Sequence, residues 1–296
     1  MKKFNDGLYI PIVTPFTEEG HVNEDGLRSN IHWYLELGVP GIICTGSNGS
    51  FDALSDEEMK KVIKITADQV SGRATVLAGT AATTTEKSIE FSQFAASVGM
   101  DGVMIVPPYY CLPTERELHE HYKSIAESIN ILVMIYNNPK RAGIDLSPEW
   151  LSKIASEIDN ISFVKDSSGD PKRVQQIISL ANGNLTVFTG NDDLSLHALV
   201  VGAKGWIAAS ASIVPEMALS LVQAVEEGNL EKAREFFYRL LPLFSFVGRS
   251  RKFVQVSKAG LEMRDHAGGM PRKPRLPLTR EEETELRKLL ENLELL

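Results

Sequence analysis

The sequence predicts an α/β protein, a (β/α)8 TIM barrel with a C-terminal helical extension. Eight short apolar runs recur along the chain, and amphipathic stretches with helix signals separate them. The runs lie about 28 residues apart on average, which is enough for one strand and one helix each. These two observations favour eight βα units closed into a barrel.

The apolar runs are short, and several are rich in valine and isoleucine. Such runs are typical of strands buried on both faces, as in a parallel sheet. A doubly wound parallel sheet is the alternative architecture, but no run is followed by the Gly-x-Gly-x-x-Gly turn of dinucleotide-binding sheets. The expected strands are Leu8–Val13, Gly41–Thr45, Thr75–Gly79, Gly102–Val106, Ile131–Tyr136, Ile161–Lys165, Leu185–Thr189 and Gly205–Ala209.

Start signals for helices lie between these strands. Capping boxes begin at Ser55 and at Thr114, each with a glutamate three residues later. Ser147 and Asp170 each precede a proline, an arrangement in which the first residue caps a helix and the proline takes its first position. The sequence therefore predicts helices that begin at these four points.

The last part of the chain carries helix patterns only. No clear strand pattern follows residue 214, so we expect a barrel over residues 1–214 and a helical extension over residues 215–296. A proline-rich connector with basic residues spans residues 268–277, interpreted as a solvated loop, with an anion-binding segment as the alternative. The helices expected in the extension are Met217–Glu227, Leu230–Phe246, Lys252–Glu262 and Thr279–Leu293.

Composition limits the class of protein. The 296 residues carry a net charge of -8 and the isoelectric point is about 5.4, which argues against a nucleic-acid partner. The first seven residues lack the apolar run of a signal peptide, and no stretch approaches the roughly 18 apolar residues of a membrane span. Cys44 and Cys111 cannot form a disulfide framework. We therefore expect a cytoplasmic enzyme with no membrane partner.

Lys165 stands out among the residues that end the expected strands, where the active site of a barrel lies. Lysines such as Lys60 and Lys172 fall on expected helices and can reach water. Burial at a strand end disfavours the ammonium form, so the neutral amine becomes available to form a Schiff base with a ketone. The alternative is a solvent-facing lysine paired with Asp166.

Three further features follow other strands. Tyr136 ends the preceding strand, so its hydroxyl can lie near the Lys165 amine and move protons, although a core tyrosine bonded to backbone is equally consistent. The serine-containing turn at residues 46–50 offers backbone N–H groups to a carboxylate, or is an ordinary turn. Arg141 can hold a second carboxylate with two hydrogen bonds, or lie exposed in solvent.

Other chemistries find little support in the sequence. None of the six histidines follows a strand directly, so a zinc site is not expected. No Gly-x-Ser-x-Gly elbow is present, and the loops after the last two strands lack a glycine-rich phosphate cup. We expect neither a cofactor nor a metal ion.

At these residues the sequence resembles the family of dihydrodipicolinate synthases and N-acetylneuraminate lyases, which are class I, Schiff-base-forming aldolases. The resemblance runs from about Leu8 to Ala211 and continues more weakly into the extension. The segments that carry it are Ile-Val-Thr-Pro-Phe at 12–16, Gly-Ser-Asn-Gly at 46–49, Pro-Pro-Tyr-Tyr at 107–110, Tyr-Asn-Asn-Pro at 136–139 and Val-Lys-Asp-Ser-Ser-Gly at 164–169.

The resemblance implies that Lys165 forms a Schiff base with pyruvate or another 2-oxo acid, with an aldehyde as a candidate second substrate. It implies that Tyr136 relays protons with Ser47, and that Tyr110 completes the relay across a dimer contact. Members of the family are usually homotetramers built as dimers of dimers. The residues that the resemblance assigns to substrate binding are Asn48 at the substrate carboxylate, Arg141 at the carboxylate of a second substrate and Ile207 near the imine.

The turn after the second strand departs from the family pattern. Such turns usually read Gly-Thr-Thr-Gly-Glu or Gly-Ser-Thr-Gly-Glu, whereas here Asn48 replaces the second threonine and Ser50 replaces the glutamate. A carbon–carbon lyase or synthase, of the dihydrodipicolinate type or a catabolic 2-oxo-acid aldolase, is the first hypothesis. The alternatives are a Schiff-base dehydratase and deaminase of a hydroxyproline-derived pyrroline carboxylate, and a 2-oxo-acid-binding paralogue without turnover.

Overall fold

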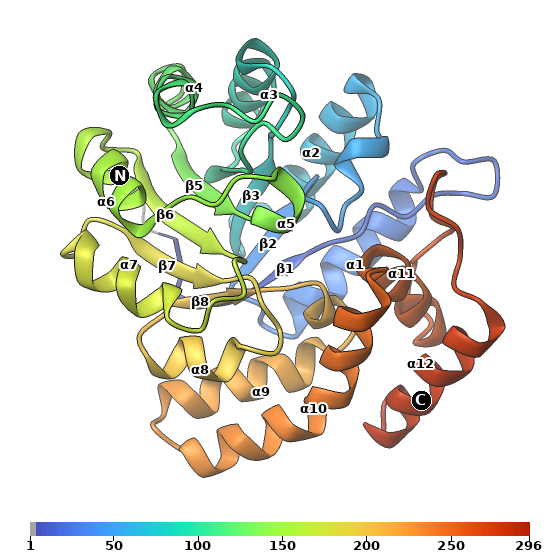
Figure 1. Cartoon of the computed structure of the whole chain (residues 1–296). Coiled ribbons are helices and arrows are strands. Elements are labelled where there is room, and N and C mark those ends of the chain that lie inside the picture. The colour runs from blue at the N-terminus through green and yellow to red at the C-terminus, as the bar shows by residue number, and fades with distance from the viewer. Residues whose placement is uncertain (1–3) are drawn as a thin grey trace.

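The computed structural model of the chain describes residues 4–296 and contains a closed barrel of eight parallel strands in sequence order (Figure 1). Each strand coincides with an expected run to within two residues at either end, so the predicted (β/α)8 barrel is confirmed. The strands are β1 (Gly7–Pro11), β2 (Gly41–Cys44), β3 (Thr75–Gly79), β4 (Gly102–Ile105), β5 (Leu132–Asn137), β6 (Ile161–Asp166), β7 (Thr186–Thr189) and β8 (Gly205–Ile207).

Helices between the strands cover the outside of the barrel (Figure 1). The capping boxes at Ser55 and Thr114 are both formed, and the Ser147 side chain caps the helix that begins at Pro148. The outer helices are α1 (Glu24–Glu36), α2 (Asp56–Val70), α3 (Thr85–Ser97), α4 (Glu115–Glu127), α6 (Pro148–Glu157), α7 (Arg173–Ala181), α8 (Ser195–Val200) and α9 (Pro215–Glu226). Short single turns are η1 (Phe51–Ala53), α5 (Pro139–Ala142) and η2 (Ser210–Ser212).

The helix expected to begin at Asp170-Pro171 begins two residues later, so that prediction is wrong in its start. Helix α7 begins at Arg173, and its N-cap Lys172 makes no side-chain cap. The Asp170 carboxylate instead accepts a hydrogen bond from the Lys172 N–H at 2.9 Å. An aspartate that bonds the backbone two residues on closes a turn, and this turn competes with the helix start.

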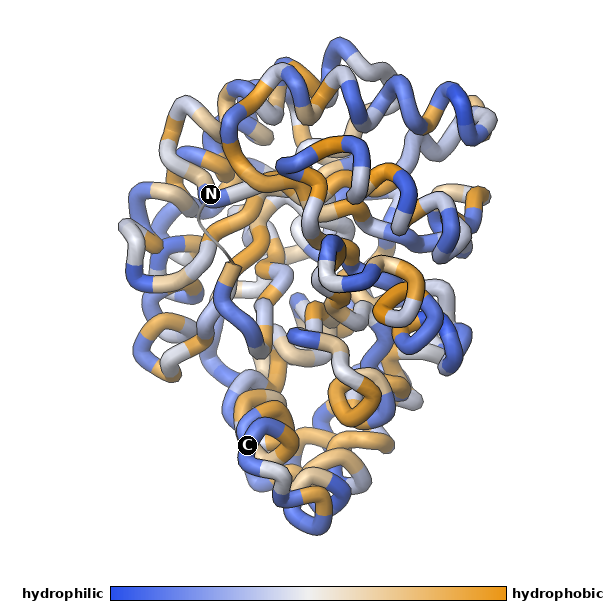
Figure 2. The backbone as a smooth tube through the Cα atoms, turned by 90° about the vertical axis from the view of Figure 1, so that its left-hand side faces the viewer, coloured by the Kyte–Doolittle hydropathy of each residue, from blue (hydrophilic) through white to orange (hydrophobic). Residues whose placement is uncertain are grey.

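The C-terminal extension consists of α10 (Leu230–Ser250), α11 (Phe253–Met263) and α12 (Arg280–Asn292), as the sequence predicts to within four residues. Figure 2 shows the C-terminal helices as a lobe that projects beyond the barrel, with the C-terminus at its surface. Helix α9 packs against both β1 and α10. The division of the chain at residue 214 therefore stays a prediction, because α9 belongs to the wall of the barrel as well as to the lobe.

The basic connector is a loop with much of its chain exposed, as expected, but two of its arginines are paired within the chain. The Arg272 guanidinium donates to the Glu58 carboxylate at 2.7 Å and to the carbonyl oxygens of Ala53 and Gly20, also at 2.7 Å. Arg275 donates to Asp52 at 2.9 Å. The connector is therefore fastened to the segment that follows β2.

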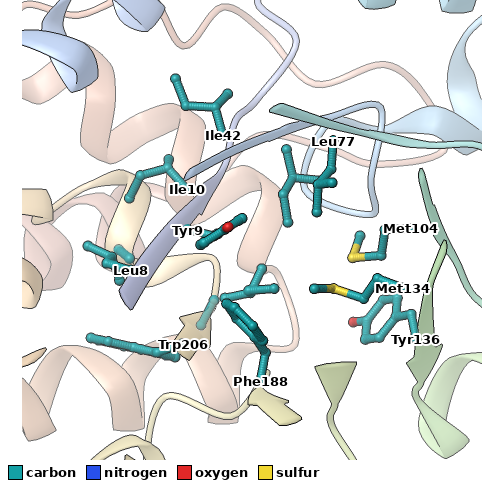
Figure 3. Packing of buried hydrophobic residues seen from close by; sticks show 14 of the residues in the cluster. Leu8, Tyr9, Ile10, Ile42, Leu77, Met104, Met134, Tyr136, Phe188 and Trp206 are labelled. Carbon is teal, nitrogen blue, oxygen red and sulfur yellow. The ribbon is translucent and has the colours of Figure 1, made fainter. Parts of the chain in front are cut away.

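Aromatic rings fill part of the barrel interior. The rings of Tyr9 and Phe188 meet edge to face with their centroids 5.0 Å apart (Figure 3). Gly41 in β2 lies opposite Tyr9, and Gly205 in β8 lies opposite Phe188. A Cβ atom at either glycine would collide with the ring opposite it. The two glycines thus make room for large side chains from the adjacent strands, and the interior is packed rather than open.

Within residues 4–296, no helix combines the length and apolar character needed to cross a membrane. Both cysteines have free thiols, with Cys44 buried at the end of β2 and Cys111 exposed.

Candidate active site

Lys165 and Tyr136 meet at the carboxyl ends of two adjacent strands. They are direct partners in the register between β5 and β6, and both side chains are buried, with 6% and 7% exposed. The Lys165 Nζ lies 4.2 Å from the centroid of the Tyr136 ring. The alternative of a solvent-facing lysine paired with Asp166 is therefore wrong, because the Asp166 carboxylate accepts from Asn137 and Ser168 instead.

The Tyr136 hydroxyl is held by a neighbouring amide. The Asn138 Nδ2 donates to it at 2.6 Å. Burial acts to raise the pKa of Tyr136, but the charge of Lys165 and the hydrogen bond from Asn138 act against burial, and the pKa lies below that of an ordinary phenol. A phenol with a lowered pKa releases and regains a proton more readily near neutral pH.

A polar network behind the pair fixes the two strand ends. Asn137 is fully buried and donates from Nδ2 to Asp166 at 2.9 Å and to Asp145 at 3.0 Å, while its side-chain Oδ1 accepts from the Leu146 N–H. Arg173 closes the network with two hydrogen bonds to Asp145 at 2.8 and 2.7 Å. Since Asn137 and Asp166 are also register partners, this network holds the residues next to Tyr136 and Lys165 in place.

The turn after β2 is tight and largely buried. Thr45 and Ser50 flank it in the left-handed region, with φ of 49° and 59°. Ser47 is half-buried, and the buried Asn48 donates from Nδ2 to the Pro11 carbonyl at 2.7 Å. The Asn48 Oδ1 and Ser50 Oγ are buried and have no hydrogen-bond partner. Two buried polar atoms of this turn are therefore unpaired within the chain, which is uncommon in folded proteins.

The other residues expected in the site lie in different surroundings. Ile207 is completely buried at the end of β8. Arg141 is exposed on α5, and its guanidinium lies 5.1 Å from the ring centroid of Phe253 in α11. Tyr110 is 90% exposed, so within one chain the structure does not bring it to Tyr136. The structure thus joins Lys165 with Tyr136 and leaves Tyr110 on the surface.

Four residues near Lys165 were not identified from the sequence. Asn138 holds the phenol, and the buried Ser167 Oγ has no hydrogen-bond partner. A Cβ atom at Gly190 would collide with Ser167 Oγ and come within 2.6 Å of Lys165 Cε, so only glycine fits beside these two side chains. Asn138 and Ser167 could have been identified from their positions in the sequence, because they directly follow the ends of β5 and β6.

Asp192, which follows β7, is the fourth of these residues. Its Oδ1 is shut away from solvent without a hydrogen-bond partner, although the residue as a whole is only half-buried. Burial raises the pKa of Asp192 to about 6, with Ser210 and the charge of Lys165 acting in the opposite direction. Burial is therefore the main cause of the raised pKa, and the charge of Lys165 is a smaller, opposing cause.

Among residues 4–296, no group of three or more histidine, cysteine or acidic side chains is arranged to hold a metal ion. The fold and the site define the class of protein as a barrel enzyme with an amine and a phenol at the carboxyl ends of adjacent strands.

Comparison with known proteins agrees with this class. The model of the Dihydrodipicolinate synthetase family matches residues 5–293. The 4-hydroxy-tetrahydrodipicolinate synthase of Methanocaldococcus jannaschii is 40% identical over 287 residues, which cover 97% of this chain and 96% of that protein. The chain belongs to the Dihydrodipicolinate synthetase family and is a lyase of that family, which confirms the resemblance identified in the sequence.

Solved structures show the same relationship. A crystal structure of a dihydrodipicolinate synthase superposes with a TM-score of 0.93 at 38% identity and covers 98% of this chain and 100% of its own. The prophage protein YagE of E. coli K12, described as a member of the dihydrodipicolinic acid synthase family in complex with pyruvate, superposes with a TM-score of 0.94 at 30% identity. That match covers 98% of this chain and 99% of YagE.

Proposed function

We propose that this lyase forms a Schiff base between Lys165 and pyruvate or a related 2-oxo acid and then makes or breaks a carbon–carbon bond. The observation that carries the proposal is the burial of Lys165 with its Nζ 4.2 Å from the ring centroid of Tyr136. The pyruvate complex of YagE supports the choice of a 2-oxo acid. The names of the relatives support 4-hydroxy-tetrahydrodipicolinate synthesis as the reaction.

The proposed reaction uses the amine of Lys165 once its ammonium group has given up a proton. The amine nitrogen adds to the carbonyl carbon of the 2-oxo acid, and the proton that the nitrogen then loses passes to the former carbonyl oxygen to give a carbinolamine. Tyr136 protonates the hydroxyl that leaves as water, and a protonated imine remains. The Tyr136 phenolate takes a proton from the adjacent carbon to give an enamine. The enamine carbon attacks the aldehyde carbon, and the aldehyde oxygen takes the proton from Tyr136 as the imine re-forms. Cleavage is the reverse of this last step.

The remaining residues take supporting roles in the proposal. Ser47 extends the proton relay, and the backbone N–H groups of the turn at Asn48 bind the carboxylate of the 2-oxo acid. Arg141 binds a carboxylate of the second substrate, and Ile207 lies against the imine. The chemistry needs neither a metal ion nor a cofactor, because the protonated imine is itself the electron sink.

Trapping of the Schiff base tests the proposal. The protein is incubated with pyruvate and borohydride, and the peptides are analysed by mass spectrometry. We expect one reduced pyruvate adduct on Lys165 and none in the Lys165→Ala variant, whose fold is checked by circular dichroism. Folded wild-type protein without an adduct on Lys165 would overturn the proposal.

A second candidate, a catabolic 2-oxo-acid aldolase, is favoured by the turn after β2. Asn48 and Ser50 stand there in place of the usual threonine and glutamate, and the Asn48 Oδ1 and Ser50 Oγ are buried without hydrogen-bond partners in the chain. To separate the two reactions, the protein is incubated with pyruvate and either an aldehyde that carries an amino group or an aldehyde without one. The ring of a tetrahydrodipicolinate contains nitrogen, so its synthesis needs the aldehyde with the amino group. Release of ammonia from a pyrroline carboxylate without an aldol product would instead indicate the dehydratase and deaminase.

We further propose that the protein is a cytoplasmic homotetramer in which Tyr110 completes the relay of a neighbouring protomer. The exposure of Tyr110 (90%) and of Leu112 (56%) supports a covered interface at this loop, since large exposed apolar groups mark contact surfaces. Sedimentation analysis should give a tetramer, and Tyr110→Phe should lower kcat while the tetramer persists. A monomer with full activity would contradict this assembly.

A further inference from the structure

A second buried lysine lies in the C-terminal extension, outside the site described above. Lys258 in α11 is 1% exposed. Its Nζ donates to the Thr14 carbonyl at 2.6 Å and to the Gly268 carbonyl at 2.7 Å. A buried amine is costly unless it is hydrogen-bonded, and both the ammonium and the neutral form have enough N–H donors for these two carbonyls.

The surroundings of Lys258 come from three segments. Its Nζ lies 4.6 Å from the ring centroid of Phe16, which follows β1, and the Arg272 guanidinium lies 4.1 Å from the centroid of the same ring. Glu262, one turn on in α11, accepts from the N–H groups of Gly268 and Gly269. The extension, the connector and the segment after β1 are thus joined around one aromatic ring.

A chain of hydrogen bonds leads from Lys258 to the turn after β2. Thr14, whose carbonyl Lys258 holds, is 1% exposed and donates from Oγ1 to the Gly49 carbonyl at 2.8 Å. The Asn48 Nδ2 bonds to Pro11 in the same segment at 2.7 Å. The segment 11–14 therefore supports the turn at two points, and Lys258 anchors that segment to the extension.

The packing in this region leaves little freedom for movement. A Cβ atom at Gly49 would come within 3.1 Å of the Thr45 N and 3.3 Å of the Ile12 O, so the turn lies directly against the segment after β1. A Cβ atom at Gly269 would come within 2.5 Å of the Phe16 O. In a closely packed region a shift of one backbone segment moves its neighbour.

We propose that Lys258 is a positioning residue, which anchors the Thr14 carbonyl so that residues 11–14 hold the turn Gly46–Gly49 in the geometry that binds the carboxylate of the 2-oxo acid. The inference rests on the proposed function of that turn. It differs from a structural role for Lys258 alone, because loss of the anchor weakens substrate binding in protein that remains folded.

The first experiment compares Lys258→Met with Lys252→Met. Lys252 directly precedes α11, and Lys258 lies within it. Each lysine loses two hydrogen bonds on substitution, but those of Lys252 go to Glu282 at 2.6 and 2.8 Å near the surface. We expect Lys258→Met to raise KM for pyruvate on the order of tenfold with a much smaller change in kcat, since small misplacements of binding groups cost about this much or more. Lys252→Met should leave both constants near those of the wild type.

Thr14→Val is the second variant and acts between Lys258 and the turn. It removes the hydrogen bond to Gly49 with little change of shape, so it should raise KM for pyruvate in the same way. If Lys258 acts through Thr14, the double variant should raise KM no further than the stronger single variant, whereas independent effects would multiply. Thr14→Val keeps the inference testable if Lys258→Met does not fold.

The outcomes separate this inference from the proposed function. Wild-type protein that yields no borohydride-trapped adduct on Lys165 overturns the function itself. An adduct on Lys165 together with an unchanged KM in folded Lys258→Met, or in Thr14→Val, overturns the positioning role only. Multiplied effects in the double variant also overturn it.

Discussion

At the scale of single residues, the position of Lys165 against Tyr136 has an electrostatic consequence. The two side chains share a buried environment, in which charges interact more strongly than in water. The positive charge of Lys165 and the Asn138 amide together lower the pKa of Tyr136 in spite of burial. A phenol in this position is suited to give a proton to the leaving hydroxyl and to take it back.

Tyr136→Phe should lower kcat by about 10²- to 10⁴-fold, because the variant keeps the ring but loses the proton relay. Steady-state kinetics measure the effect, and borohydride trapping should still yield a slowly formed adduct on Lys165. Tyr122→Phe is the matched control, since Tyr122 is also fully buried but donates only to the Ile105 carbonyl. A Tyr136→Phe variant with kcat near the wild-type value would show that the relay runs elsewhere.

Lys258 makes the stability of the protein depend on pH. Burial lowers the pKa of Lys258 from 10.5 to about 7, with Arg272 acting in the same direction and Glu262 opposing it. Between these values the unfolded chain binds a proton that the folded chain has released, so the free energy of unfolding rises with pH. The rise from pH 7 to pH 9 should be about 2 kcal/mol.

Urea denaturation of the wild type and of Lys258→Met at several pH values measures this contribution. The free energy of unfolding of the wild type should rise relative to that of Lys258→Met as the pH increases above 7. Contributions from the other titrating groups are shared by both proteins and cancel in this difference. Parallel curves for the two proteins would show that Lys258 does not titrate in this range.

At the scale of elements, the site depends on how the ends of β5 and β6 are joined. Asn137 donates to Asp166 and Asp145, and Arg173 at the start of α7 holds Asp145. These bonds link two strands and the following helix at the level of Tyr136 and Lys165. The register of the strands and the polar network thus specify the same arrangement.

Asn137→Ala should destabilise the protein by about 3 kcal/mol, because it leaves the Asp166 and Asp145 carboxylates and the Leu146 N–H with fewer partners in a buried region. Urea denaturation measures the loss, and the exposed Asn184→Ala serves as the control. A loss below about 0.5 kcal/mol, typical of surface substitutions, would contradict the importance of this network.

At the scale of the whole molecule, the helical lobe is fastened to the mouth of the barrel and not only to its wall. Lys258 reaches the segment after β1, and Arg272 and Arg275 in the connector reach Glu58 and Asp52 after β2. Figures 1 and 2 show the lobe to one side of the barrel, so these contacts join parts that are distant in sequence. The lobe therefore supports the turns on which substrate binding is proposed to depend.

Arg272→Met should lower the free energy of unfolding by about 2 kcal/mol, because Glu58 and the carbonyls of Ala53 and Gly20 lose their donor. Arg275→Met removes only the exposed pair with Asp52 and should cost less than about 1 kcal/mol. Thermal or urea denaturation compares the two variants. Equal losses would indicate that the Arg272 contacts add nothing beyond a surface ion pair.

Much of this arrangement could be predicted from local patterns. The apolar runs marked all eight strands, because parallel strands are buried on both faces. The capping boxes at Ser55 and Thr114 marked helix starts, because caps are local interactions. The family motifs also identified Lys165 and Tyr136, since residues at neighbouring strand ends of a barrel must lie close together.

The sequence by itself determined the barrel, the family and the lysine and tyrosine pair, because strand periodicity, caps and strand-end positions are encoded within a few residues. Only the tertiary structure decided that Asn138 bonds the Tyr136 hydroxyl, that the basic connector pairs with Glu58, and that Lys258 anchors Thr14. The last two contacts join residues more than 200 positions apart. Local patterns carry no information about such pairs, because their partners are chosen by the packing of the whole chain.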